Sequence, residues 1–222
     1  MKFAAFETST EWCSVALWLD GEIRGLEEKA GNRHSELALP MLEKLLQDEK
    51  LTAKDLAAVA FGSGPGSFTG LRIACGLAQG IALARGIPVL AISSLEALAE
   101  ESGATRVVAC LDARMREVYY SALEKVDGRW REVIGAECIS PEKISVPAGS
   151  GWVGCGNGFA AYREILASRI ADVKPEIHPS AVAVARLAAP RLAAGEGVDA
   201  ALAAPIYVRD KVAFTSGELK AR

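Results

Sequence analysis

Histidine is scarce in this sequence, and cysteine never occurs in a metal-binding spacing. Only His34 and His178 are present, which excludes a histidine-rich metal site. The cysteines stand apart among apolar neighbours, without a CxxC motif, at Cys13, Cys75, Cys110, Cys138 and Cys155. Free cysteine packs as a small hydrophobic residue, so we expect reduced cysteines in the core and no metal centre.

Long apolar runs and an excess of basic charge are also absent. No segment reaches the roughly 20 apolar residues that span a bilayer, and Glu7 interrupts the N-terminus before a signal-peptide core could form. We therefore expect a cytoplasmic protein without membrane contact. The formal net charge of −3 offers no broad basic surface, so this chain is not expected to be the main anchor for RNA.

The chain of 222 residues is long enough for two small lobes. Apolar alternation, helical periodicity and turn signals predict a three-strand meander followed by alternating helices and strands. Strands are expected at 2–6, 12–19, 22–28, 56–61 and 87–92, and helices at 33–49, 71–84 and 93–101. From Thr105 the order partly repeats, with strands at 106–111, 117–123, 130–139 and 152–155, a short helix near Pro141, and helices at 159–170 and 180–195.

This partial repeat predicts the fold class. The second half repeats the element order of the first in shortened form. This is the arrangement of the two-lobed α/β actin-like ATPase (ASKHA) fold, which is built from duplicated RNase H-like halves with nucleotide held between them. We place the boundary near Ser102–Gly103. The first lobe then spans 1–103, and the second spans 104–222, including a C-terminal alanine-rich helix and a polar tail after Tyr207.

A glycine-rich loop at 62–72 joins a predicted strand to a predicted helix. Glycines allow the backbone to approach an anion, and a helix start offers free N–H groups, so the loop suits phosphate. Its candidate phosphate-binding residues are Gly64, Gly66, Ser67, Thr69 and Gly70. No Gly-Lys-Ser/Thr closes the loop as in a Walker motif. A tight turn that packs a helix against a sheet, with Gly66 at positive φ, is an equally open interpretation.

The first strand-to-strand turn supplies further candidates, Thr8 and Ser9. Actin-type ATPases place hydroxyl groups near the phosphates at this turn, although Ser and Thr are also ordinary turn residues. Glu7 is expected to face the loop, where its negative charge would repel a phosphate. The segment 149–154 matches GxGxxG, but it precedes a strand, and we interpret it as a turn.

Six segments together resemble the bacterial TsaB family, also called YeaZ: FETSTEWCSVAL, NRHSELALPMLEKLL, GSGPGSFTGLRIACGLAQGIA, ISSLEALA, LDARMREVYYS and PIYVRD. The resemblance implies a subunit of the complex that makes threonylcarbamoyladenosine (t6A) beside the anticodon of tRNA. It implies binding to the transferase TsaD, with the ATPase TsaE joining the pair and tRNA reached only through the complex. TsaD-like proteins carry a metal-holding histidine pair where this chain has Ser94 and Leu98. The resemblance therefore implies an inactive paralogue with no catalytic residues, no metal and no required cofactor.

Two other functions stay open at this point. A small-molecule kinase could use the same cleft, but Asp112, its candidate carboxylate, is followed by Ala113-Arg114-Met115-Arg116 and lacks the second glycine turn that such kinases use. A stand-alone nucleotide-binding protein is permitted by the glycine loop. We expect weak ATP or ADP binding at most, because the loop has no lysine.

The helices at 33–49 and 71–85 are expected to form the partner interface. Apolar anchors and small residues allow close helix packing, and the candidates are His34, Leu37, Met41, Leu45, Arg72, Ala74, Gly76 and Ala78. Burial of both helix faces against their own sheet is the alternative. The same surface is expected to form a homodimer when the chain is alone, because a patch shaped for a paralogue is close to self-complementary.

Overall fold

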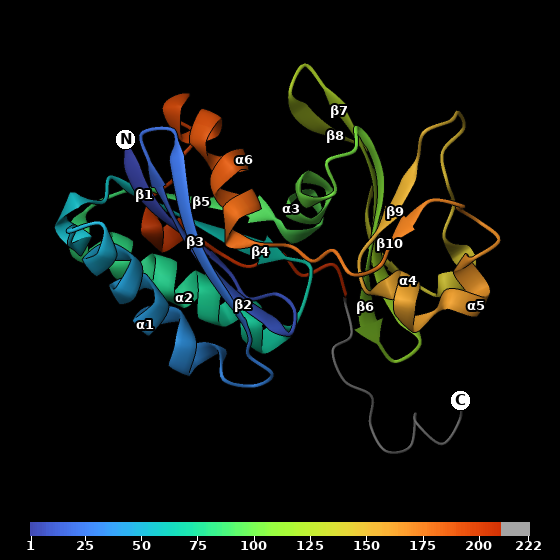
Figure 1. The fold of residues 1–222 in the computed structure, drawn as a ribbon, viewed down its shortest axis with the longest axis horizontal. Coiled ribbons are helices and arrows are strands. Elements are labelled where there is room, and N and C mark those ends of the chain that lie inside the picture. Colours follow the sequence, from blue (N-terminus) through green and yellow to red (C-terminus); the bar gives the residue numbers. More distant parts are fainter. Residues whose placement is uncertain (210–222) are drawn as a thin grey trace.

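The computed structural model describes residues 1–209 and contains two five-stranded mixed sheets that lie side by side (Figure 1). The first sheet has the order β3-β2-β1-β4-β5. Its strands are β1 (Lys2–Glu7), β2 (Trp12–Leu19), β3 (Glu22–Lys29), β4 (Ala58–Gly64) and β5 (Val89–Ser93). The central strand β1 pairs antiparallel with β2 and parallel with β4, which is why its middle residues, Phe3-Ala4-Ala5-Phe6, are all apolar and buried.

Helices cover both faces of this first sheet. Strand side chains alternate between faces, so Ala4 and Phe6 pack under α1 (His34–Asp48) and α2 (Phe68–Arg85), whereas Phe3 and Ala5 point to the opposite face. That opposite face is covered by α6 (Ala181–Ala193). Between the lobes lies α3 (Ser94–Glu101), whose apolar side chains pack against the second sheet (Figure 1).

The second sheet has the order β10-β9-β6-β7-β8, so its three leading antiparallel strands are again followed by two parallel ones. Its strands are β6 (Arg106–Arg114), β7 (Glu117–Val126), β8 (Arg129–Ile139), β9 (Val153–Cys155) and β10 (Val173–Lys174). The matching strand order confirms the predicted duplication. The second half is shortened, because the predicted helix at 159–170 is two single turns, α4 (Gly158–Ala161) and α5 (Arg163–Leu166).

The predicted domain division is wrong for the C-terminal helix. Although α6 follows the second sheet in sequence, it returns to the first lobe and packs on β1, β2 and β4. The small side chains of α6 allow it to lie close to an equally small sheet surface that includes Ala5, Ala16 and Ala60. The first lobe therefore contains residues from both ends of the chain. Three short 3-10 turns complete the fold: Ala53–Asp55, Pro141–Lys143 and Ala200–Leu202.

Within residues 1–209, no helix combines the length and the apolar character needed to cross a bilayer.

Candidate functional site: the cleft between the lobes

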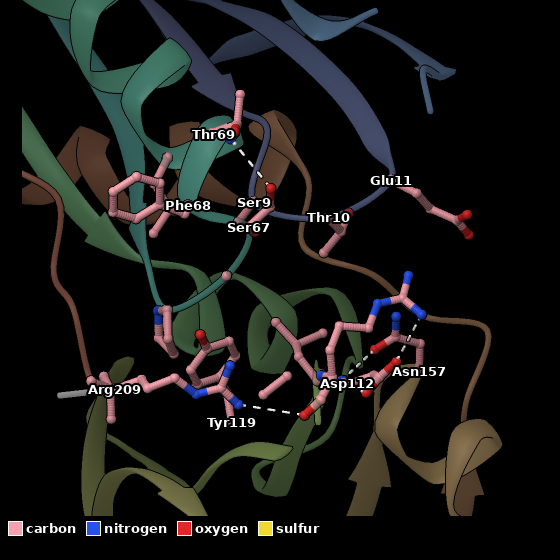
Figure 2. Close-up of a pocket in the computed structure, with 18 of the residues that line it drawn as sticks. Ser9, Thr10, Glu11, Ser67, Phe68, Thr69, Asp112, Tyr119, Asn157 and Arg209 are labelled. Carbon is pink, nitrogen blue, oxygen red and sulfur yellow. Dashed lines mark hydrogen bonds and ion pairs between the residues drawn. The ribbon is translucent and has the colours of Figure 1, made fainter. Parts of the chain in front are cut away.

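A cleft of about 960 Å³ opens between the two lobes (Figure 2). The first lobe contributes the β1–β2 turn and the loop between β4 and α2, and the second lobe contributes the end of β6 and Asn157. Residues 206–209 line a further side. This is the position in which a two-lobed fold of this kind holds a ligand.

The predicted phosphate-binding residues are brought together, but they pack against one another. The backbone N–H of Ser67 donates to the carbonyl oxygen of Ser9 at 2.7 Å, and the Thr8 hydroxyl donates to the carbonyl oxygen of Gly70 at 2.7 Å. A Cβ atom at Gly66 would lie 2.5 Å from the Cβ of Ser9, and one at Gly70 would lie 1.8 Å from the carbonyl oxygen of Thr8. The loop and the turn are thus in direct contact, leaving no space for a phosphate between them.

The reason for the glycine at position 66 differs from the predicted one. Positive φ occurs at Gly64, at 113°, and not at Gly66. Gly66 is needed because the backbone of the β1–β2 turn approaches too closely for a side chain.

The start of α2 nevertheless faces the cleft. The side chain of Ser67 caps the helix by accepting a hydrogen bond from the Gly70 N–H at 3.4 Å, and the exposed residues 67–69 lie at the cleft edge (Figure 2). Nearby, the buried Ser9 Oγ has no hydrogen-bond partner among the described residues. A helix start attracts anions, so one wall of the cleft retains a feature suited to negative charge.

The Glu7 carboxylate lies against Gly62, the first residue of the glycine-rich loop, where an added Cβ would be 1.9 Å from its Oε2, so it faces this end of the loop as expected. Its carboxylate accepts hydrogen bonds from the Ser9 N–H at 2.6 Å and from the Ser94 hydroxyl at 2.9 Å. Only 1% of Glu7 is exposed, and burial raises the pKa of its carboxyl group, although these hydrogen bonds oppose the shift. Ser94 therefore holds a buried carboxyl group in this chain.

The opposite wall of the cleft contains Asp112, the candidate kinase carboxylate. Its Oδ1 accepts a hydrogen bond from the Arg114 N–H at 2.9 Å, and its Oδ2 lies 3.4 Å from the Arg114 guanidinium. Its backbone N–H donates to the side-chain oxygen of Asn157 at 2.9 Å (Figure 2). Both carboxylate oxygens are therefore engaged within the second lobe, which leaves this side chain poorly placed to activate a substrate hydroxyl.

Residues 203–209 form a strap that crosses from the first lobe to the second. The Ile206 N–H donates to the carbonyl oxygen of Ser63 at 2.7 Å in the first lobe. At the far end, the Arg209 guanidinium donates to Glu117 of β7 at 2.6 Å. Sequence reasoning used PIYVRD only as a mark of resemblance and missed this role. The predicted polar tail after Tyr207 lies, from residue 210 onward, outside the described residues.

The predicted partner-interface residues divide into buried and accessible groups. Four of them are buried, namely His34, Leu45, Ala74 and Ala78. The prediction is wrong for Leu45, Ala74 and Ala78, because the inner faces of α1 and α2 pack on their own sheet. His34 instead lines the cleft, where its Nε2 lies 2.9 Å from the carbonyl oxygen of Thr10. Two are partly buried, Leu37 and Met41, and two are exposed, Arg72 and Gly76. Further exposed apolar side chains that the prediction missed are Leu39, 42% exposed, and Leu83, 62% exposed.

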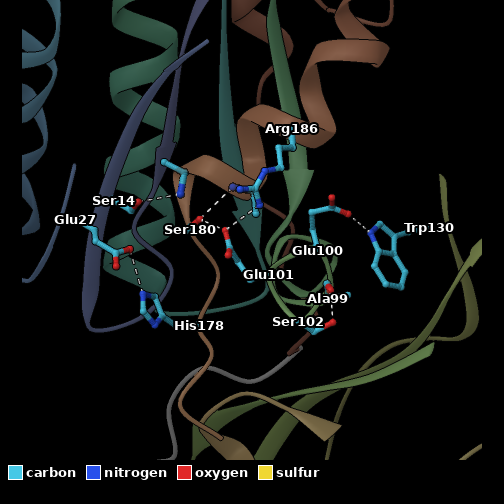
Figure 3. Close-up of polar contacts among 12 residues, drawn as sticks. Ser14, Glu27, Ala99, Glu100, Glu101, Ser102, Trp130, His178, Ser180 and Arg186 are labelled. Atoms are coloured by element: carbon cyan, nitrogen blue, oxygen red, sulfur yellow. Dashed lines mark hydrogen bonds and ion pairs between the residues drawn. The ribbon is translucent and has the colours of Figure 1, made fainter. Parts of the chain in front are cut away.

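A second hollow, of about 490 Å³, borders the segment that returns from β10 to α6. The Ser180 hydroxyl donates to Glu101 at 2.5 Å, and the His178 ring lies 3.3 Å from the carboxylate of Glu27 (Figure 3). These contacts fasten residues 174–180 to the first lobe. We therefore assign this hollow a structural role. In the part of the chain that the structure describes, no three His, Cys, Asp or Glu side chains converge as metal ligands.

Two halves of matching strand order, with a glycine loop at the cleft between them, define an actin-like ATPase fold. The family model for TsaD, described as tRNA N6-adenosine threonylcarbamoyltransferase, matches residues 27–215. The Escherichia coli K12 tRNA threonylcarbamoyladenosine biosynthesis protein TsaB is 36% identical, covering 96% of this chain and 97% of its own length. The Haemophilus influenzae protein of the same name is 37% identical, covering 95% and 94%. A solved structure of YeaZ from Pseudomonas aeruginosa is 39% identical, covers 93% of this chain and 99% of its own, and superposes with a TM-score of 0.88. The chain belongs to the TsaB family.

Proposed function

We propose that this chain is a non-catalytic subunit of the t6A-synthesis complex, where it binds TsaD and allows TsaE to join the pair. The names of its relatives support a role in t6A biosynthesis. The proposal assigns the transfer reaction to TsaD and a structural role to this chain. We place this assembly in the cytoplasm, where it meets its tRNA.

The observation that carries the proposal is the outer face of α2. Gly76 and Gly80 are one helical turn apart, and an added Cβ at either would meet nothing within 4 Å. Leu83 lies one turn further along and is strongly exposed. Small residues let another helix approach closely, and the leucine supplies an apolar anchor. The match of this chain to the TsaD family model supports a partner with counterpart helices.

The geometry of the cleft supports the non-catalytic part of the proposal. The glycine loop is packed onto the β1–β2 turn, and Asp112 is engaged by its own neighbours. Ser94 and Leu98 of α3 are both buried and supply no imidazole ligand. Phosphoryl transfer needs positioned cations and a free carboxylate, and these residues provide neither.

Nucleotide binding by the isolated chain is proposed to be weak and unnecessary for its role. The start of α2 and the unpartnered Ser9 Oγ favour an anion. No lysine occurs in the loop, so the loop itself lacks the point charge with which phosphate-binding loops hold a nucleotide.

The test is Gly76→Arg, which adds a long charged side chain to the outer face of α2. Arginine has a higher helix propensity than glycine, so the substitution should not weaken the helix itself. We expect the variant to fold normally and to lose at least about tenfold in TsaD affinity, since charged side chains are disfavoured at the core of an interface. The matched control is Ala167→Arg, which adds the same charge at an exposed position of the second lobe. Unchanged TsaD affinity of Gly76→Arg, measured by calorimetry, would place the interface elsewhere.

A further inference from the structure

The turn between β6 and β7 is built from residues that ordinarily avoid its backbone conformation. Arg114, Met115 and Arg116 have φ values of 61°, 54° and 58°. In this left-handed region the Cβ atom crowds the following carbonyl oxygen, so tight hairpin turns strongly favour Gly, Asn or Asp. Three successive side chains are therefore kept at this turn against the local preference of the backbone.

Two other hairpins in the same chain provide an internal comparison. Asp20-Gly21 joins β2 to β3 with φ values of 54° and 116°, and Asp127-Gly128 joins β7 to β8 with φ values of 50° and 77°. Both turns use the residues that left-handed backbone prefers. Among these three hairpins, only the β6–β7 turn has Met115-Arg116 in place of the preferred residues. This difference indicates that its side chains have a role other than turning the chain.

The turn presents its side chains outward and holds its backbone firmly. The Arg114 side chain is 87% exposed, Met115 is 41% exposed, and Arg116 is exposed. From beneath, the Arg209 guanidinium lies 3.4 Å from the Arg114 carbonyl oxygen and 3.9 Å from the Met115 sulfur. Asp112 accepts from the Arg114 N–H, so the strap and the end of β6 together fix a projecting basic turn.

We propose that this turn, residues 114–116, contacts the phosphate backbone of the tRNA when the chain is part of its complex, an inference that rests on the proposed function. Guanidinium groups match phosphate oxygens with two parallel hydrogen bonds. Arg114 pairs with Asp112 at 3.4 Å, but its own side chain is 87% exposed, so most of its five N–H donors remain accessible to phosphate oxygens. Within residues 1–209 Arg116 belongs to no ion pair, although its positive charge helps to lower the pKa of Glu142.

An acidic protein surface is the competing partner, and the turn fits it less well. Protein contact sites centre on a desolvated and well-packed anchor, whereas this turn projects two charged side chains around a single exposed methionine. Phosphate contacts position a nucleic acid without needing such a packed centre. A net charge of −3 on the whole chain means that attraction to RNA must be local.

The experiment measures tRNA affinity of the assembled complex of this chain, TsaD and TsaE over a range of salt concentrations, by fluorescence anisotropy. The double variant R114Q/R116Q should bind tRNA about tenfold more weakly at low salt, and the slope of log affinity against log salt should fall by about one to two. The second variant, M115N/R116G, should show weaker binding together with a higher melting temperature of the free chain, because it relieves the turn. Arg163→Gln, which removes an exposed arginine elsewhere in the second lobe, is the control and should bind as wild type.

The possible results distinguish a failure of the proposed function from a failure of the tRNA contact alone. If the wild-type chain forms no complex with TsaD, the proposed function is wrong, and this inference is overturned with it. If the complex forms and R114Q/R116Q leaves both tRNA affinity and salt slope unchanged, the turn does not contact phosphate. If the variant instead weakens binding of TsaD or TsaE while tRNA affinity holds, the turn is a protein contact, and the inference is again overturned.

Discussion

Replacing Gly66 with alanine tests whether the glycine loop is a packing element. The new Cβ would lie 2.5 Å from the Cβ of Ser9 and 2.6 Å from its carbonyl oxygen, whereas carbon atoms in contact ordinarily lie about 3.5–4.0 Å apart. The loop must therefore move by about 1 Å, which strains the 2.7 Å hydrogen bond from the Ser67 N–H to Ser9. Overpacking of this kind costs about 1–3 kcal/mol, and part of that cost is a hydrogen bond worth about 1 kcal/mol.

The assay is thermal and urea unfolding of the purified chain, followed by TsaD binding. A loss of 1–3 kcal/mol corresponds to a fall in melting temperature of about 2–12 °C for a chain of this length. TsaD binding should also weaken, because Gly66 lies just before the capping residue of α2. For the unfolding measurement alone, the matched control is Gly80→Ala in an exposed part of α2, where an added Cβ meets nothing and stability should rise by up to about 1 kcal/mol. Equal stability of the two variants would refute the packing argument, as would tight nucleotide binding that Gly66→Ala abolishes while TsaD still binds.

Three further predictions follow from the first lobe. Burial raises the pKa of Glu7 in the folded state, so the stability of the wild-type chain should fall as pH rises above about 4.5, the ordinary value of the group. Glu7→Gln should remove that part of the slope, which urea unfolding between pH 4.5 and 7 would detect; an identical slope in both proteins would contradict the assignment. Leu45→Glu should destabilise the fold by about 3 kcal/mol or more, because Leu45 is buried, whereas Leu83→Glu should leave the melting temperature within about 1–2 °C and reduce TsaD binding; the opposite pattern would reverse our assignment of the helix faces. Finally, the free chain should form a homodimer through the outer face of α2, and TsaD should displace the second copy; light scattering that shows a homodimer persisting inside the TsaD assembly would exclude a shared surface.

Much of the fold could be predicted because local patterns determine it. Asp20-Gly21 and Asp127-Gly128 give recognisable turns, and apolar alternation in β1 and β2 shows which stretches become strands. The position of α6 could not be predicted in the same way. Its alanines make it compatible with any small, flat surface, and only the complementary alanines of the first sheet decide where it packs.

The candidate site was harder to predict, since periodicity identifies apolar residues but not what covers them. Leu45 and Ala78 suit a partner helix equally well in sequence, yet the sheet of the first lobe already buries them. The surroundings of Gly66 and Glu7 also depend on three-dimensional contacts, since Gly66 lies against Ser9 and the Glu7 carboxylate accepts a hydrogen bond from Ser94. The role of Arg209 depends on Glu117, a residue 92 positions earlier, and no local pattern indicates such a pair.

The most direct test of the central claim is t6A formation in a reconstituted system. Product is measured as labelled threonine incorporated into tRNA in the presence of ATP and bicarbonate. Reactions would contain TsaD, TsaE and a source of the threonylcarbamoyl adenylate, with wild-type chain, with Gly76→Arg, or without this chain, and one reaction would contain this chain without TsaD. A non-catalytic partner should give no product without TsaD, full product when both are present, and little product when it is omitted or carries Gly76→Arg. Product formed by this chain in the absence of TsaD, or an unchanged yield when this chain is left out, would contradict the account.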